Sequence, residues 1–239
     1  MGSKRQQVTI KKLTTMKKTI ILSLLCMILA IPATAQPGYR YGRPRVQTVG
    51  RHGNELIAWH SYYFGLRLGL NASHVSSDSP ILDGNGVQSG LNLGFVAGTQ
   101  LTYRAPLFFE TGLYYSQKGG KSGAGPEKFT YDLNYLEVPL LIKYKHFVGN
   151  QTSIQPYAGG YLAVGTDGEI KNYGTRTAFS SFDDGYFNRF DGGIKLGCGV
   201  GFNMLYLDAS YDIGLANIGQ DSFNDTHNGC FTLNIGVNF

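Results

Sequence analysis

The chain has 239 residues, of which 42% are hydrophobic, 13% aromatic and 15% charged, and 33 are glycine. Low charge with many aromatic side chains excludes an intrinsically disordered chain. Glycine at this density excludes a helical bundle, because each glycine inside a helix costs about 1 kcal/mol. The length suits a single β-rich domain.

The formal net charge of +5 comes from the start of the chain. Residues 1–35 hold six of the 21 basic residues and no acid, which leaves 15 basic against 16 acidic residues, or a net charge of −1. A chain-wide basic surface is therefore not predicted, and neither is a nucleic-acid partner.

Residues 1–35 are predicted to be a secretory signal peptide, with Met16 as an alternative start. Lys17-Lys18 precede an apolar run over 19–31, and Ala33-Thr34-Ala35 fits a signal-peptidase site. The run is shorter than the roughly 20 residues that a transmembrane helix needs. The next segment, 36–60, holds four arginines and one glutamate, and it is predicted to be a flexible basic tail in the periplasm.

From Tyr62 onward, apolar and polar residues alternate with a period of two, which is the signature of β-strands. Eight strands are predicted, over 64–73, 88–104, 107–118, 129–146, 152–169, 186–202, 205–217 and 229–239. Within the fourth, Pro139 predicts a local break in the hydrogen-bonded ladder.

The connections after the second, fourth and sixth strands are short, whereas those after the first, third, fifth and seventh are long and polar. This pattern is typical of an all-β, up-and-down transmembrane barrel with short periplasmic turns and long extracellular loops. We therefore predict an eight-stranded antiparallel outer-membrane β-barrel over 61–239. An even number of strands places both of its ends in the periplasm.

Most strands have one apolar face and one face of charged, amide and glycine residues. Nine ionisable residues fall on the polar face: Arg67, Glu110, Glu137, Lys143, Arg189, Asp191, Lys195, Asp208 and Asp212. In a membrane barrel this face lines the lumen, whereas in a soluble lipocalin-like binding barrel the apolar face would form the core. Alternation alone allows both. The two signs of charge, the glycines and the aromatic Phe239 favour the membrane barrel.

The interior of an eight-stranded barrel is just wide enough for side chains to fill it. With this many ionisable residues pointing inward, a plugged lumen is predicted. The strand phases put Cys198 on the outer face and Cys230 on the inner face, so a disulfide between them is not predicted. Several aromatic residues are predicted to lie at the membrane interface, namely Trp59, His60, Tyr62, Tyr63, Tyr114 and Tyr115.

A family resemblance supports this fold. The stretch from Tyr135 to Tyr144 reads YLEVPLLIKY and is similar to the Tyr-Leu-Glu-Ile-Pro-Leu-Leu-Leu-Lys motif of the PorT-like outer-membrane barrel family. Residues 156–160 and 192–199 resemble later segments of the same family, and the likeness covers about 62–239. It implies that the barrel-assembly machinery reads Phe239 and the last strand. It also implies a link to protein secretion or transport, with an envelope or secretion partner besides outer-membrane lipid.

The predicted function is that of a non-enzymatic outer-membrane protein that acts through its loops, its tail or the structure of the envelope. Besides the soluble lipocalin-like binding barrel, a second alternative is a membrane-embedded hydrolase or acyltransferase, whose residues would be His74, Ser76, Ser77, Asp78, His227 and Asp225 in two long loops. Nothing in the sequence fixes a catalytic geometry, so no catalytic residue is assigned. The five histidines lack ligand spacing, so no metal site is predicted. Gly197, Gly199 and Gly201 lie within one strand, so no nucleotide site or other cofactor is predicted.

Overall fold

A computed structural model describes residues 62–77, 84–102, 105–122, 129–148, 151–172, 177–182, 187–219 and 225–239. The predicted signal peptide and tail, 1–35 and 36–60, lie outside these ranges. The described residues form the strands β1 Tyr62–Ser77, β2 Gly84–Gln100, β3 Leu107–Ser122, β4 Phe129–Tyr144, β5 His146–Val148, β6 Thr152–Asp167, β7 Glu169–Asn172, β8 Thr177–Ser180, β9 Phe190–Phe202, β10 Leu205–Gly214 and β11 Thr226–Asn238. No helix in the described part is long and apolar enough to cross a membrane.

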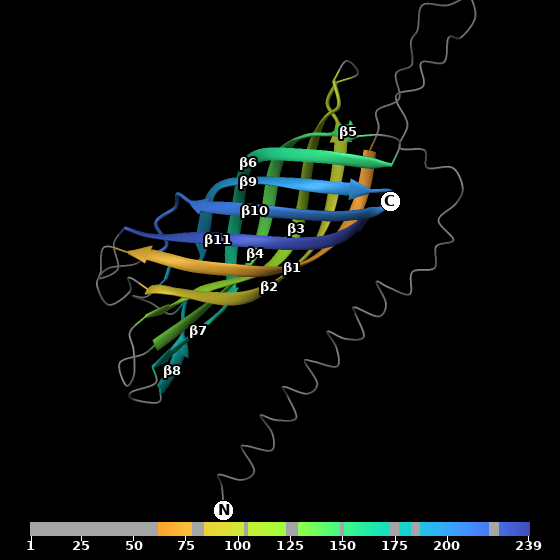
Figure 1. The fold of residues 1–239 in the computed structure, drawn as a ribbon. Coiled ribbons are helices and arrows are strands. Elements are labelled where there is room, and N and C mark those ends of the chain that lie inside the picture. Colours follow the sequence, from red (N-terminus) through yellow and green to blue (C-terminus); the bar gives the residue numbers. More distant parts are fainter. Residues whose placement is uncertain are drawn as a thin grey trace, which may run out of the picture. The chain divides into compact units, whose positions relative to one another are not determined.

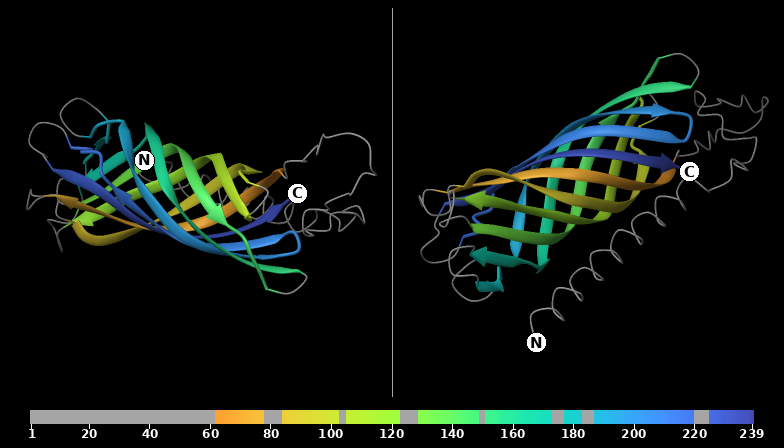
Figure 2. Two further views of the ribbon diagram at one scale, coloured as in Figure 1. Left: turned by 90° about the horizontal axis from the view of Figure 1, so that it is seen from above. Right: turned by 60° about the horizontal axis from the view of Figure 1, so that its bottom comes forward.

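Eight strands close into one antiparallel barrel (Figures 1 and 2). Strands β1, β2, β3, β4, β6, β9, β10 and β11 pair in succession, and β11 pairs with β1 to complete the circle. At this seam the backbones of Phe64 and Phe239 exchange hydrogen bonds of 3.2 and 2.8 Å. Closure removes the free sheet edges that lipid could not satisfy with hydrogen bonds. The predicted fold is confirmed.

The two ends of the barrel differ. We call the end that holds Tyr62 and Phe239 the terminal end, and it also carries the short connections after β2, β5 and β9. We call the opposite end the loop end. Here β7 pairs with β4, and β8 pairs with β7, forming a hairpin that extends the sheet beyond the barrel (Figure 1). The sequence predicted a long polar connection at this place, over about 170–185. The hairpin forms because β4 runs past the end of its pairing with β6 and offers a free edge.

The predicted break at Pro139 is confirmed on one side of β4. The pairs Thr111–Leu140 and Tyr114–Glu137 keep the same register, but no pairing with β3 is made at Pro139 between them. On the other side, Pro139 stays in register with Tyr161 of β6. Proline has no backbone N–H to donate, so one of its two ladders is interrupted.

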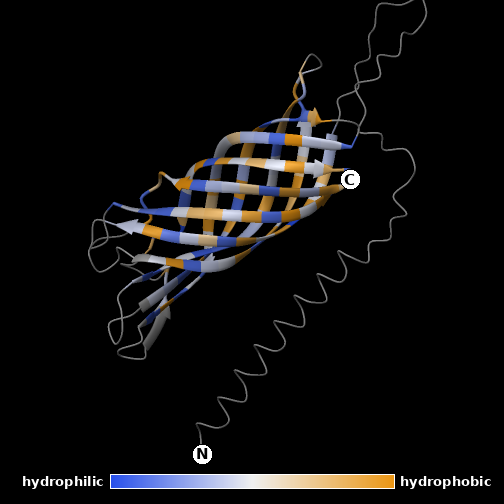
Figure 3. Cartoon of the chain, in the orientation of Figure 1, coloured by the Kyte–Doolittle hydropathy of each residue, from blue (hydrophilic) through white to orange (hydrophobic). Residues whose placement is uncertain are grey.

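The predicted alternation of apolar and polar residues along the strands is confirmed (Figure 3), and the exposed fractions of the side chains place the apolar face outward. Leu66, Phe95 and Leu233 are exposed on the outside, whereas polar side chains are buried in the lumen. This excludes the lipocalin-like alternative, which needs the apolar face inside. The prediction for Arg189 is wrong. It is exposed just before β9, where its guanidinium lies 5.3 Å from the ring centre of Phe182.

Two of the predicted interfacial aromatic residues are also wrong. Tyr62 and Tyr115 are exposed on the outer face, but Tyr63 is buried in the lumen and Tyr114 covers Gly94 there. Neighbouring residues of a strand point to opposite faces, so adjacent tyrosines cannot both face lipid. Trp59 and His60 lie outside the described residues. The two cysteines are unpaired as predicted, with Cys198 exposed and Cys230 buried.

Candidate functional site: the charged interior of the barrel

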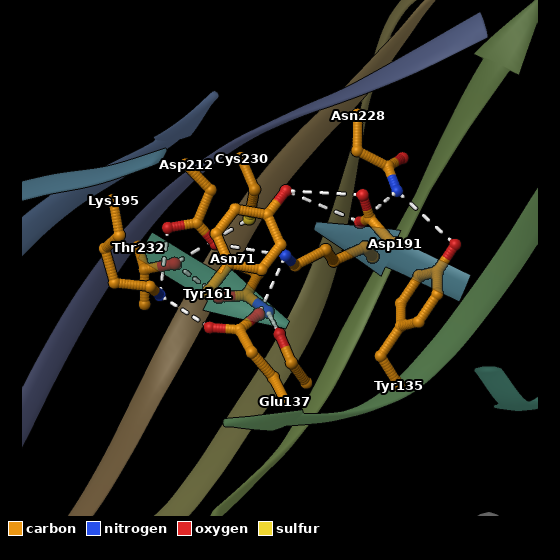
Figure 4. A network of polar contacts seen from close by, with 12 residues as sticks. Asn71, Tyr135, Glu137, Tyr161, Asp191, Lys195, Asp212, Asn228, Cys230 and Thr232 are labelled. Atoms are coloured by element: carbon orange, nitrogen blue, oxygen red, sulfur yellow. Dashed lines mark hydrogen bonds and ion pairs between the residues drawn. The ribbon is translucent and has the colours of Figure 1, made fainter. Parts of the chain in front are cut away.

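Four buried charges form a closed ring across the middle of the lumen. Lys118 Nζ lies 2.8 Å from Glu137 Oε2 and 3.0 Å from Asp212 Oδ2. Lys195 Nζ lies 2.7 Å from Glu137 Oε1 and 2.9 Å from Asp212 Oδ1. Figure 4 shows Glu137, Lys195 and Asp212 converging from different strands. We call these four residues the central cluster.

The central cluster spans the full width of the barrel. Lys118 is on β3 and Asp212 on β10, and these strands are four steps apart in either direction around the circle. Their direct contact therefore bridges opposite walls. A buried charge is tolerated when it is paired and hydrogen-bonded. Here each ammonium meets two carboxylates and each carboxylate meets two ammonium groups, so the cluster is neutral.

A second group of charges lies nearer the terminal end. Lys143 Nζ donates to both oxygens of Glu110 at 2.8 Å and to the hydroxyl of Tyr206 at 2.9 Å. Arg67 Nη2 lies 3.9 Å from Glu110 Oε2 and donates to Asn238 Oδ1 at 2.7 Å. We call Arg67, Glu110, Lys143, Tyr206 and Asn238 the terminal-end cluster. It joins β1, β3, β4, β10 and β11, so it too crosses the lumen.

Aromatic rings fill the space around these cations. The guanidinium carbon of Arg67 lies 4.2 Å from the ring centre of Tyr206, and Lys118 Nζ lies 4.4 Å from that of Tyr161. Lys145 Nζ lies 3.6 Å from the ring centre of Tyr63 at the terminal end. A ring face attracts a desolvated cation and fills volume that water would otherwise take. The hydroxyl of Tyr63 donates to Glu110, which ties this layer to the terminal-end cluster.

Hydrogen bonds between side chains continue the network towards the loop end (Figure 4). Asp191 accepts from Asn228 Nδ2 at 2.8 Å and from the hydroxyl of Tyr161 at 3.4 Å. Asn71 donates to Ser116 Oγ at 3.0 Å and accepts from Thr232 Oγ1 at 2.8 Å. The interior polar groups are thus held by side chains of several strands.

An apolar cluster of buried residues lies at the loop end of the barrel. The buried residues Val75, Tyr131, Leu133, Tyr135, Tyr161, Ala163, Phe182, Phe187 and Ile218 pack together. Phe182, Phe187 and Ile218 come from the segments that connect β8 to β9 and β10 to β11. A backbone bond from Phe187 N to Ser181 O (3.2 Å) lies within the first of these segments, and one from Asn188 N to Ile218 O (2.7 Å) joins the two segments to each other. We call this set of nine residues the loop-end cap.

Sequence reasoning missed two of the interior cations. Lys118 lies in phase with Glu110 and Ser116, so extending the inward register of the third strand would have found it. Lys145 lies in phase with Lys143, one residue beyond β4. The inward tyrosines were less accessible to prediction, because a tyrosine suits a lipid interface as well as a packed interior.

The candidate enzyme residues are not assembled into a catalytic set. His74 lies on the outer face beside Tyr211, and His227 Nδ1 lies 3.0 Å from the carbonyl of Ala216. Ser76 and His227 are register partners at the loop end of β1 and β11, but in the described part of the chain neither histidine makes a hydrogen bond with a serine or a carboxylate. Ser77 faces inward and bonds to Thr226, Asp225 is exposed, and Asp78 lies outside the described residues. Within the described ranges no group of three or more His, Cys, Asp or Glu residues could hold a metal ion.

The geometry is that of a lipid-facing barrel with ionised side chains inside, and a family comparison agrees with it. Residues 47–220 match the family described as outer membrane protein beta-barrel domain. The chain belongs to this family. It is an integral β-barrel of the bacterial outer membrane. The matched region begins at residue 47, inside the segment that the sequence predicted to be a tail.

Comparison with solved structures finds other small outer-membrane barrels at low sequence identity. The chain is similar to Ail, the attachment invasion locus protein of Yersinia pestis, with 16% identity, a TM-score of 0.40, and coverage of 74% of this chain and 98% of Ail. For Neisserial surface protein A the identity is 18% and the TM-score 0.39, with coverage of 73% of this chain and 95% of that protein. For the N-terminal β-barrel domain of Pseudomonas aeruginosa OprF the identity is 11% and the TM-score 0.34, with coverage of 73% of this chain and 97% of that domain. No curated protein sequence matches the chain.

Proposed function

We propose that this protein is a non-enzymatic outer-membrane barrel with a plugged lumen, which acts through its ends and its place in the envelope. The observation that carries the proposal is the central cluster, because its ion pairs join opposite walls of the barrel. The terminal-end cluster and the loop-end cap add two further barriers along the same axis. A hydrated solute would have to separate buried ion pairs, each of which is costly to break.

The first experiment establishes the embedded barrel. Membrane-fraction protein is run on SDS gels with and without boiling, and a shift in mobility on boiling is expected for a closed barrel. The second experiment measures conductance across a planar lipid bilayer after insertion of the purified protein. We expect no stepwise increase in current for the wild type. Regular current steps from heat-modifiable protein would refute the plugged lumen.

A designed variant makes the conductance test sensitive. Replacing Lys118 and Asp212 by alanine removes three of the four ion pairs of the central cluster, together with the two side chains that meet across the lumen, and leaves Lys195 paired with Glu137. This variant is expected to produce current steps if the clusters are the barrier. The matched control is Lys171→Ala, because Lys171 forms ion pairs on the exterior of the hairpin, 3.3 Å from Asp132 and 3.2 Å from Glu169. It should stay as silent as the wild type.

The orientation is part of the proposal. We place both ends of the barrel, Tyr62 and Phe239, in the periplasm, with the loop end facing the outside. Support comes from the short connections at the terminal end and the long ones opposite. In intact cells, a protease added outside should then cut the loop-end connections and leave a tag attached near residue 60 untouched. The reverse pattern would overturn the assignment.

We further propose two partners besides outer-membrane lipid. The barrel-assembly machinery would read β11, whose outer face carries Phe231, Leu233, Ile235 and Phe239 as exposed apolar residues. A role as an accessory of protein secretion or transport rests on the resemblance of 135–144 alone. Deleting the gene and looking for secreted proteins trapped in the periplasm tests it, and normal secretion would remove it.

A further inference from the structure

The polarity of the barrel wall reverses along its axis, and β4 shows this most clearly. From Leu136 to Tyr144 the outward residues are apolar, while Glu137 and Lys143 point inward. From Tyr135 back to Tyr131 the apolar residues point inward instead, where they join the loop-end cap. The sequence itself contains the switch, because its apolar residues change from odd to even positions between 135 and 136.

The other strands change at the corresponding place. Towards the loop end, the row of large apolar residues on the outer face gives way to a polar side chain on each strand or its immediate extension. On β2 one exposed apolar residue, Val87, still follows that polar side chain. The polar residues are His74, Ser89, Gln117, Asn134, Thr166, Asn188, Asn217 and His227, one for each barrel strand, and we call them the polar ring. The residues below them on the outer face include Leu70, Leu136, Val164, Phe190 and Leu215, all of which are exposed.

The polar ring lies in a plane roughly perpendicular to the barrel axis. Gln117 and Asn134 are register partners, whereas Ser89 pairs with Ala72 and His227 pairs with Ser76, on either side of His74. The strands of a barrel are tilted, so a ring perpendicular to the axis must step through the register in a constant sense. Relative to His74, the ring residue of β2 lies at the register of Ala72, towards the terminal end. The ring residue of β11 lies at the register of Ser76, towards the loop end, so the steps on the two sides have the same sense around the barrel.

The strands are also too long for the membrane alone. A strand of 16 residues that rises about 3.3 Å per residue and tilts by about 40° covers roughly 40 Å along the axis, whereas the lipid-facing band of such barrels is about 25 Å tall. The segment of β4 whose outward residues are apolar, from Leu136 to Tyr144, has nine residues, which matches the roughly 9–11 that a transmembrane strand requires. The surplus lies at the loop end.

We infer that the outer boundary of the bilayer lies at the polar ring, and that the barrel beyond it stands in water as a stub with its own apolar core, the loop-end cap. Between the ring and the terminal end the wall contacts acyl chains, and the ring itself contacts the lipid headgroups. Above the ring the outer wall carries Asp132 and Lys171, whose side chains form an ion pair of 3.3 Å. The surface offered to the outside is thus the wall of the stub as well as its loops.

The inference needs the membrane barrel and, for the side that the stub faces, the proposed orientation, but it does not need the plugged lumen, so a conducting wild type would leave it standing. The test uses spin labels on single introduced cysteines in a Cys198→Ser background. Cys230 is retained because it is buried, and the background protein itself must take up no label. Labelled protein is reconstituted in phosphatidylcholine vesicles. Collisions of each label with oxygen, which concentrates in lipid, and with a water-soluble nickel chelate are then compared.

The informative variants are neighbours on one face of the wall. Leu136→Cys and Val164→Cys lie below the ring, and Asn134→Cys and Thr166→Cys belong to it. We expect labels at the first two sites to collide mainly with oxygen and labels at the other two mainly with the nickel chelate. Wild-type protein labelled at Cys198 provides the lipid-exposed reference. Nickel-shielded labels at Asn134 and Thr166 would move the boundary outward and refute the stub, and nickel-accessible labels at Leu136 and Val164 would equally refute its position.

Discussion

Lys118→Met removes a buried cation that bonds two carboxylates and keeps an unbranched side chain that is one atom shorter. In the wild type, Lys118 lies 2.8 Å from Glu137 and 3.0 Å from Asp212, and its side chain has no exposed surface. Without it, two carboxylates share Lys195 alone, and the central cluster changes from neutral to a net charge of −1. Removing one partner of a buried ion pair costs about 3–5 kcal/mol, because the remaining charge has lost its hydration as well as its partner.

The free energy of unfolding should therefore fall by about 3–5 kcal/mol. It is measured by urea titration in lipid vesicles, with the heat-modifiable gel mobility as the signal for the folded barrel. The control is Lys171→Met, which removes an ion pair of similar geometry whose lysine side chain is 44% exposed. An exposed pair contributes no more than about 1 kcal/mol.

A second variant separates the lost charge pair from lost packing. Lys118→Met combined with Glu137→Gln restores a neutral cluster, since Lys195 and Asp212 remain 2.9 Å apart. The double variant should lose less stability than the two single changes added together, because the two residues interact directly. If Lys118→Met costs no more than Lys171→Met, or if the two changes are additive, the central cluster does not hold the barrel together as described.

Three further predictions concern the interior, the thiols and the hairpin. Gly199→Ala places a methyl group against the ring and hydroxyl of Tyr206 and should cost about 1–3 kcal/mol, measured as an earlier loss of heat-modifiable mobility. Gly160→Ala is its control, because the added Cβ would have one neighbour, the carbonyl oxygen of Gly193 at 3.5 Å. Cys198 and Cys230 should both react with a thiol reagent after the protein is unfolded without reductant, and failure to react would reveal a disulfide. In vesicles a water-soluble reagent should reach neither thiol, since Cys198 faces lipid and Cys230 is buried. Partial burial lowers the pKa of Lys171, but its hydrogen bonds to Glu169 and Asp132 and their charges outweigh this effect, so its pKa lies above the usual value. The stability that Lys171 adds is thus fully present below the unfolded pKa of about 10.4 and is lost as the pH rises through the folded pKa. The difference in stability between wild type and Lys171→Met should shrink in strongly alkaline buffer, and a difference that grows would contradict the ion pairs.

Some of the candidate site could be predicted from the sequence, and the reason is local. A strand turns successive side chains to opposite faces, so Arg67, Glu110 and Lys143 had to share a face with the other polar residues of their strands. The short turns and long loops likewise follow from turn chemistry within a few residues. Continuing the alternation of inward and outward residues along the third and fourth strands would have added Lys118 and Lys145 to the same face. What failed was residue-type reasoning, which placed Tyr63 and Tyr114 at the membrane interface against the phase of their own strands.

By itself the sequence determined the period, the number of strands, the order of short and long connections and the grouping of residues into two faces. It did not determine which face was inside, because a period of two has the same form for a soluble barrel and a membrane barrel. It also could not show that Lys118 meets Asp212, since strands on opposite walls share no register and no sequence proximity. Closure of the barrel decided both points. It brought β11 against β1, set the distance across the lumen, and thereby selected which of the many inward charges would touch.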